Sequence, residues 1–147
     1  MGPPSPRPCA SCPYRRDVPS GVWAFEEYEK LRGYDRDMGS QAPQLFQCHQ
    51  TGSEAALRRM CAGWVGSHGG RELLALRLAL IQGRISAATF AAAEEFESTE
   101  PLFASGAEAA DHGQREIEQP GLAARNAMRK VARSRRDIAN ADLRVRG

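Results

Sequence analysis

The sequence lacks the features that would place it in a membrane or direct it across one. No apolar run reaches the length that spans a bilayer, and the first residues, MGPPSPRP, contain no hydrophobic signal segment. We therefore expect a cytoplasmic protein with no membrane partner, in a compartment where thiols stay reduced. With 20 basic and 18 acidic residues among 147, the net charge of +2 indicates no particular partner.

The sequence also lacks the patterns of common enzyme classes. It shows no glycine-rich phosphate loop, no dinucleotide-binding fingerprint, no HExxH helix and no Ser/His/Asp pattern. This absence favours a regulatory or interaction module over an enzyme, and no small-molecule substrate is indicated. An iron–sulfur enzyme is the less favoured alternative, because its substrate site need not be marked in the sequence.

Strand patterns and βαβ alternation are absent as well, whereas helical spacing of apolar residues recurs. Residues 54–68 are ambiguous, since two glycines follow Met60. We expect a mostly α, small single domain of about five helices, with a four-cysteine domain over 1–118 and a basic C-terminal helix or tail over 119–147. The predicted helices cover about 21–32, 71–82, 86–96, 105–117 and 122–140, the second of them as the central core helix.

The N-terminal third has an irregular composition. Six of the nine prolines lie within the first 19 residues, where they fix φ and remove backbone donors. Regular structure is therefore not expected before Ser20, the predicted N-cap of the first helix. Order in this segment has to come from something that ties the loop down.

Four cysteines are the candidates for that role: Cys9, Cys12, Cys48 and Cys61, spaced C-x2-C-x35-C-x12-C. Two thiolates separated by two residues of one loop can bind the same ion. Two further thiolates then complete either a tetrahedral zinc site or the four corners of a 4Fe-4S cluster. The spacing predicts a metal centre that organises the N-terminal third, and it leaves zinc and the iron–sulfur cluster open.

Other interpretations of these residues compete with the metal centre. A cysteine such as Cys61 can be a small buried hydrophobic residue, although a proline-rich loop offers Cys9 and Cys12 little apolar burial. A thioredoxin-type dithiol would need its CxxC at a helix start after a strand, which is not predicted here. Among the histidines, His68 is a possible alternative ligand.

Several separate motifs in this chain resemble those of one family. The segments PCASCPYRRDVPSGVW, FQCHQ and CAGWVGSH follow the pattern CxxCP[YW]R…FxCHQ…CAGW of an uncharacterised family of small actinobacterial and phage proteins. The resemblance implies the four cysteines as the site, with His49, Gln50 and Trp64 beside it. In layout alone the chain is also similar to the WhiB-like iron–sulfur regulators, without their C-x2-C-x5-C spacing.

Basic residues mark two further places where a partner could bind. Arg15 and Arg16 directly follow the CxxC, where they could offset the charge of a tetrathiolate centre or contact phosphate. Residues 121–147 hold eight basic and two acidic residues. On a helix, four of these arginines form one stripe, which predicts a surface for nucleic acid or a partner protein, with a solvated face as the simpler alternative. The stripe consists of Arg125, Arg129, Arg133 and Arg136.

Overall fold

The structure is a computed structural model that describes residues 1–48 and 58–134. Within these residues it contains six α-helices, two short 3₁₀ turns and only isolated β-bridges, so the expected mostly α single domain is confirmed. His49, Gln50 and Arg136 lie outside the described residues. The helices are α1 (Phe25–Arg32), α2 (Ala62–His68), α3 (Leu74–Ile81), α4 (Ala87–Glu95), α5 (Gly106–Gln114) and α6 (Leu122–Ser134).

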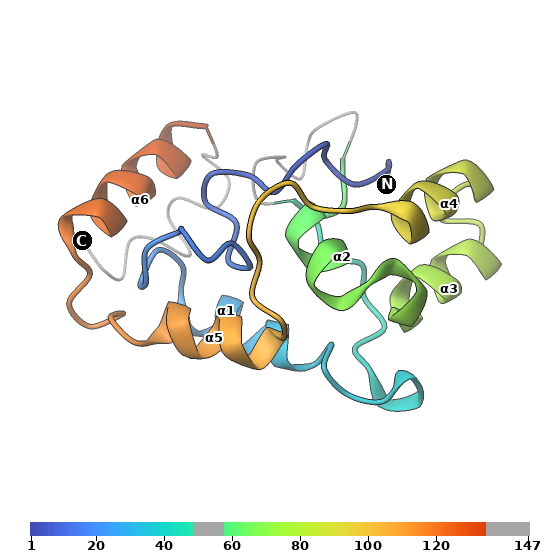
Figure 1. The fold of residues 1–147 in the computed structure, drawn as a ribbon, viewed down its shortest axis with the longest axis horizontal. Helices are drawn as coiled ribbons and strands as arrows, with labels where there is room; N and C mark the ends of the chain where they lie inside the picture. The colour runs from blue at the N-terminus through green and yellow to red at the C-terminus, as the bar shows by residue number, and fades with distance from the viewer. Residues whose placement is uncertain (49–57, 135–147) are drawn as a thin grey trace.

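Helices α1 and α5 pack side by side, and two glycines of α5 allow this close approach (Figure 1). A Cβ atom at Gly113 would lie 2.0 Å from Cε1 of Tyr28, and one at Gly106 would lie 1.9 Å from the carbonyl oxygen of Leu31. The backbone of α5 therefore takes the space that a side chain would fill elsewhere. We call this unit the α1–α5 pair.

Two predicted helix starts are confirmed by their caps. The Ser86 hydroxyl accepts a hydrogen bond from the Thr89 amide at the start of α4, and the Ser105 hydroxyl accepts one from the Glu108 amide at the start of α5. The Asp35 carboxylate adds a second cap to α5 by accepting from the amides of Gly106 and Ala107, at 2.7 and 2.8 Å. These contacts satisfy amides that have no partner inside the helix.

The predicted start of the first helix is wrong, because α1 begins at Phe25 and not at Gly21. Gly21 has φ +81°, a conformation outside the helix. Ser20 does not cap α1. Its hydroxyl donates to the Gly113 carbonyl and accepts from the Glu116 amide, so it joins the chain to the end of α5.

Helix α2 lies in the second half of the ambiguous segment 54–68, where the two glycines argued against a helix. Gly63 and Gly66 lie inside this helix because neighbouring side chains occupy the space beside them: Cys12 at Gly63, and Leu102 at Gly66. The cost of two glycines in a helix is thus offset by tight packing.

The prediction that residues 71–82 form the central core helix is also wrong in the position of that helix. Helix α3 begins at Leu74, after a 3₁₀ turn at Gly70–Glu72, and lies beside α4 at the edge of the fold (Figure 1). Its Ile81 side chain is 81% exposed. Helix α3 does contribute the buried Leu76, but the largest buried side chains come from the N-terminal third and α2. They are Trp23, Trp64, Tyr14 and Tyr28. None of the described helices has the length and apolar character needed to cross a membrane.

Candidate metal centre

The CxxC forms a tight turn that the core holds in place. The Cys12 amide donates to the Cys9 carbonyl at 3.0 Å, and the Arg15 amide donates to the Cys12 carbonyl at 3.1 Å. The buried indole N–H of Trp23 donates to the Ser11 carbonyl at 2.8 Å. Residues 101–103 bind the far end of the loop, where the Phe103 amide donates to the Tyr14 carbonyl. The proline-rich start is thus anchored by single backbone contacts and not by regular structure.

The other two cysteines lie on a short antiparallel pairing. The Cys48 amide donates to the Arg59 carbonyl, and the Cys61 amide donates to the Phe46 carbonyl, both at 2.8 Å. Cys48 lies opposite Arg59 and Cys61 opposite Phe46, two residues along the strand from Cys48, so the two cysteines are diagonal neighbours on the same face of the pairing. Between these two hydrogen bonds, Gln47 and Met60 form an isolated antiparallel bridge. We call residues 9–15, 46–48 and 59–64 together the cysteine junction.

The four thiols of the junction are neighbours and form no disulfide. The sulfurs of Cys12 and Cys61 lie 3.7 Å apart. Hydrogen bonds from Cys12 and then Cys48 lower the pKa of Cys9, whereas burial raises the pKa of Cys12. The contacts therefore link the thiols in the order Cys48, Cys9, Cys12, Cys61, with residues far apart in sequence brought together.

The backbone of α2 makes room for one of these sulfurs. A Cβ atom at Gly63 would lie 2.2 Å from Sγ of Cys12 and 2.9 Å from Cβ of Tyr14, closer than real atoms approach. The Cys61 sulfur, at the start of the same helix, accepts a hydrogen bond from the Trp64 amide at 3.4 Å. The CAGW motif therefore has a physical basis: the cysteine supplies a thiol, the glycine admits a second one, and the next amide stabilises the first.

An aromatic layer closes the inner side of the junction. The rings of Tyr14, Tyr34, Phe46 and Trp64 pack edge-on or stacked, with centroids 5.4 to 6.5 Å apart. The indole N–H of Trp64 is buried and is the one buried side-chain donor without a hydrogen-bond partner in the described part of the chain. Because this layer excludes water, polar groups facing the junction interact strongly.

Thiols are ligands that thiophilic metals prefer. One pair of them also has the sulfur–sulfur distance expected for two ligands of one ion. Two sulfurs bound to one tetrahedral zinc ion lie about 3.8 Å apart, given a Zn–S bond of about 2.3 Å, and the Cys12–Cys61 pair lies at 3.7 Å. The full set is not closed around one point. Within residues 1–48 and 58–134, no three His, Cys, Asp or Glu side chains are arranged as ligands of a single ion.

The arginines after the CxxC occupy different surroundings. Arg15 lies beside the junction, where its guanidinium binds Asp17 at 2.7 and 2.8 Å and donates to the Pro8 carbonyl at 3.1 Å. Arg16 is exposed and lies over the Phe103 ring, 5.4 Å from its centroid. The predicted role in offsetting thiolate charge thus suits Arg15 by position better than Arg16.

His68 lies in a network that sequence reasoning did not anticipate. Its Nε2 atom is 2.9 Å from the Tyr14 hydroxyl, and its Nδ1 atom is 3.6 Å from a carboxylate oxygen of Asp35. Both ring nitrogens therefore face polar partners other than the cysteines. Burial lowers the pKa of His68 to about 4. No local pattern marks this network, since its three residues come from separate segments.

Most of the chain, including the residues of this site, matches one protein-family model. Residues 4–135, which include all four cysteines, match the model of a family of unknown function, DUF6283. The chain belongs to DUF6283. The match confirms the predicted resemblance to an uncharacterised family, and the cysteine junction and the α1–α5 pair both lie inside the DUF6283 match. No curated protein and no solved structure matches the chain.

Proposed function

We propose that this protein is a small metal-binding module in which Cys9, Cys12, Cys48 and Cys61 hold one metal centre, with a regulatory or interaction role. The convergence of four thiols from three segments supports this proposal. Segments without regular structure have few other ways to be fixed, and a structural metal supplies that free energy directly. With all ligand positions taken by thiolates, the centre is closed and therefore structural, not hydrolytic.

The spacing of one thiol pair favours zinc over a 4Fe-4S cluster. The Cys12 and Cys61 sulfurs are 3.7 Å apart, which is the edge of a zinc tetrathiolate, about 3.8 Å. In a cubane cluster each cysteine binds a different iron atom, so the ligand sulfurs lie farther apart. We therefore place zinc first and keep the iron–sulfur cluster, with its capacity to sense oxygen or redox state, as the alternative.

Metal analysis of the protein purified without oxygen tests the proposal. We expect about one zinc per chain and a colourless sample, whereas iron, sulfide and a brown colour would support the cluster. Each of the four Cys→Ser variants should lose the metal. The matched control is Ser67→Ala, which removes a small polar side chain that hydrogen-bonds the Phe103 carbonyl outside the junction. Metal-free protein that keeps its fold under these conditions would contradict the proposal.

A second candidate role is the binding of a nucleic acid backbone by α6. Arg125, Arg129 and Arg133 are exposed, while Ala124, Met128 and Val131 on the same helix are buried. The helix therefore packs by its apolar side and presents arginines outward. If this stripe binds phosphates, the binding constant should fall steeply with salt, and Arg125→Glu with Arg129→Glu should flatten that dependence. A salt-independent isotherm would dismiss the role.

A further inference from the structure

A cavity of about 470 Å³ lies between the turn that follows α1, the end of α2 and the start of α5. We call it the His68 cavity. Its walls carry three carboxylates and one guanidinium, which belong to Asp35, Asp37, Glu72 and Arg36. The volume falls within the range of small-molecule sites, and the excess of negative charge favours a cationic ligand.

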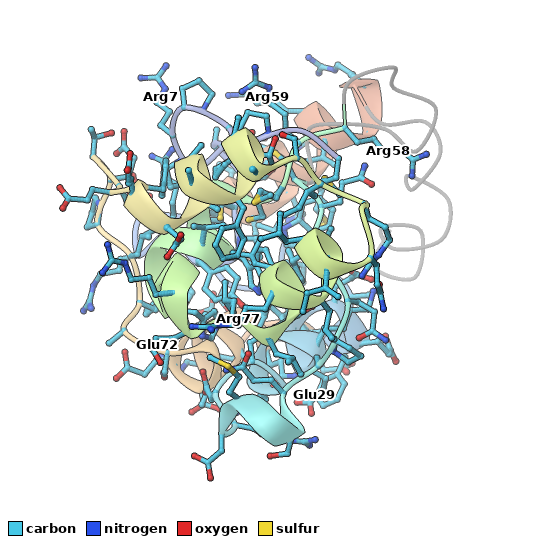
Figure 2. All side chains as sticks on the ribbon, turned by 90° about the vertical axis from the view of Figure 1, so that its right-hand side faces the viewer. Arg7, Glu29, Arg58, Arg59, Glu72 and Arg77 are labelled. Atoms are coloured by element: carbon cyan, nitrogen blue, oxygen red, sulfur yellow. The ribbon has the colours of Figure 1, made fainter. Side chains whose placement is uncertain are left out.

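The cavity lies away from the arginines beside the cysteine junction. Figure 2 shows Glu72 in the lower half of the molecule, whereas Arg7 and Arg59 lie at its upper edge. Arg77 lies in the same half as Glu72, but its guanidinium donates to the Arg71 carbonyl at 3.0 Å and is not on the cavity wall.

The walls of the His68 cavity are held in place by a buried amide. The Nε2 atom of Gln41 donates to the carbonyls of Arg36 and Glu72, at 3.1 and 2.8 Å. Its Oε1 atom accepts from the Leu74 amide at 2.9 Å. Gln41 thus joins the turn after α1 to the segment before α3. Because these walls are fixed before a ligand arrives, binding does not require them to be ordered.

The start of α5 also borders the cavity, but its amides are already engaged. The amides of Gly106 and Ala107 donate to Asp35, and the amide of Glu108 donates to the Ser105 hydroxyl. These are the groups by which a helix start binds an anion. Their engagement inside the protein disfavours an anionic ligand and leaves the carboxylates to select the charge.

One ring nitrogen of His68 faces a carboxylate of the cavity without bonding it. The His68 side chain is 7% exposed, and its Nε2 atom lies 2.9 Å from the Tyr14 hydroxyl. Its Nδ1 atom lies 3.6 Å from Oδ1 of Asp35, which is longer than a hydrogen bond, and no hydrogen bond joins it to residues 1–48 or 58–134. A donor placed between these two atoms would reach both.

We propose that the His68 cavity binds a small alkylamine, with its ammonium group between the Asp35 carboxylate and Nδ1 of His68. An ammonium donates to two acceptors at once, whereas two ligands are too few for a metal ion. Because Nδ1 accepts, Nε2 carries the ring hydrogen and donates to the Tyr14 oxygen. The alkyl chain lies along Met38, and a second ammonium group, as in a diamine, meets Glu72. This inference does not rest on the proposed metal centre.

Calorimetric titration of the full chain tests the ligand class. Putrescine, a diamine, should bind more tightly than n-butylamine, and the neutral isostere 1-butanol should give no binding heat. Glu72→Gln should weaken putrescine binding severalfold and leave n-butylamine binding unchanged. The matched control is Glu95→Gln, which removes the same charge from an exposed residue of α4 outside the cavity. Binding of 1-butanol as tight as that of n-butylamine, or equal effects of the two variants, would overturn the inference.

Asp35→Asn tests the inner end of the cavity, because it removes the charge and keeps one oxygen for the cap of α5. Both amines should lose affinity by about tenfold, with the helix content checked by circular dichroism. Nα-acetyllysine methylamide carries the same ammonium on a peptide-like backbone, so it distinguishes a free amine from a lysine side chain of a partner protein. It should bind more weakly than n-butylamine, and tighter binding would contradict a site for free amines.

Nitrogen NMR of the histidine rings separates this inference from the proposed function, because it can be read with or without a bound metal. With putrescine, the Nδ1 signal of His68 should shift while the ring hydrogen stays on Nε2. The internal control is His112, whose Nε2 atom lies 2.7 Å from the Val18 carbonyl, outside the cavity. If the chain takes up no metal, the proposed function fails while the His68 signals still decide this inference. A hydrogen on Nδ1 in the complex, or equal shifts at both histidines, would show that no ammonium binds there.

Discussion

The cysteine junction and the α1–α5 pair stabilise the fold in different ways. In the α1–α5 pair, backbone groups are satisfied inside helices and at caps, and glycines allow the helices to meet closely. In the junction, isolated hydrogen bonds connect segments that have no regular structure apart from the start of α2, and three of the four thiols are buried. The pair is complete as it stands, whereas the proposed function makes the junction depend on a bound metal.

Metal removal should have the largest effect and should separate the two regions. With chelator and reductant present, we expect the free energy of unfolding to fall by about 4 kcal/mol or more, because the metal binds the folded chain alone. Hydrogen exchange should speed up in residues 9–15 and 59–61 and stay slow in α1 and α5. Equal loss of protection in both regions would show that the pair does not stand by itself.

Each of two glycine substitutions should destabilise one of the two regions. Gly113→Ala places a Cβ atom 2.0 Å from the Tyr28 ring, and Gly63→Ala places one 2.2 Å from the Cys12 sulfur. We expect each to cost about 3 kcal/mol of stability, with metal content reduced only in Gly63→Ala. Gly39→Ala is the matched control, because nothing lies within 4 Å of its Cβ position. Loss of metal in both variants would contradict the separation of the regions.

Acid should weaken the contact between the two regions through His68. Its pKa is about 4 in the folded protein, below the ordinary value of 6.5, because the ring is buried. The unfolded chain therefore takes up the proton first, so stability is full above about pH 6.5 and falls by about 3 kcal/mol as the pH drops to 4. Urea titrations across this range should show a smaller fall in His68→Gln. The same fall in both proteins would exclude His68 as the cause.

The smallest effect should come from one hydroxyl in the α1–α5 pair. The Tyr28 hydroxyl accepts hydrogen bonds from the amides of Val22 and Trp23, both at 3.1 Å. Tyr28→Phe leaves these buried amides without that acceptor and should cost about 1–2 kcal/mol. Lys30→Ala on the same helix, which removes an exposed ion pair with Glu27, should cost under about 0.5 kcal/mol. Denaturant midpoints measure both, and equal effects would contradict this account.

The same comparison shows what the sequence could and could not predict. The predicted starts of the helices at 86 and 105 were correct because Ser86 and Ser105 cap amides that lie three residues further along the chain. Ser20 has the same chemistry, but its partners are Gly113 and Glu116, which no local pattern reveals. The spacing of apolar residues predicted the helical class. The spacing of the cysteines predicted that their thiols lie near one another. The position of α3 did not, because the side of a leucine-rich helix that faces the core depends on its neighbours.

Gly63 illustrates the limit at the candidate site. A glycine inside a helical segment argues against a helix on propensity alone, yet here it is the residue that admits the Cys12 sulfur. The network of Tyr14, His68 and Asp35 was likewise invisible, since each residue comes from a separate segment. Residue type and spacing identified the candidate ligands, but the packing around them required the fold.

The pairing of Cys48 with Arg59 has a practical consequence for protein engineering. The hydrogen bond between the Cys48 amide and the Arg59 carbonyl fixes the two ends of the intervening stretch relative to each other. Lengthening a stretch whose ends are already joined adds little entropic cost. A short epitope or a reporter domain grafted between these two residues should therefore leave the sulfur atoms where they are. The protein could in this way carry an inserted cargo and keep the four thiols together.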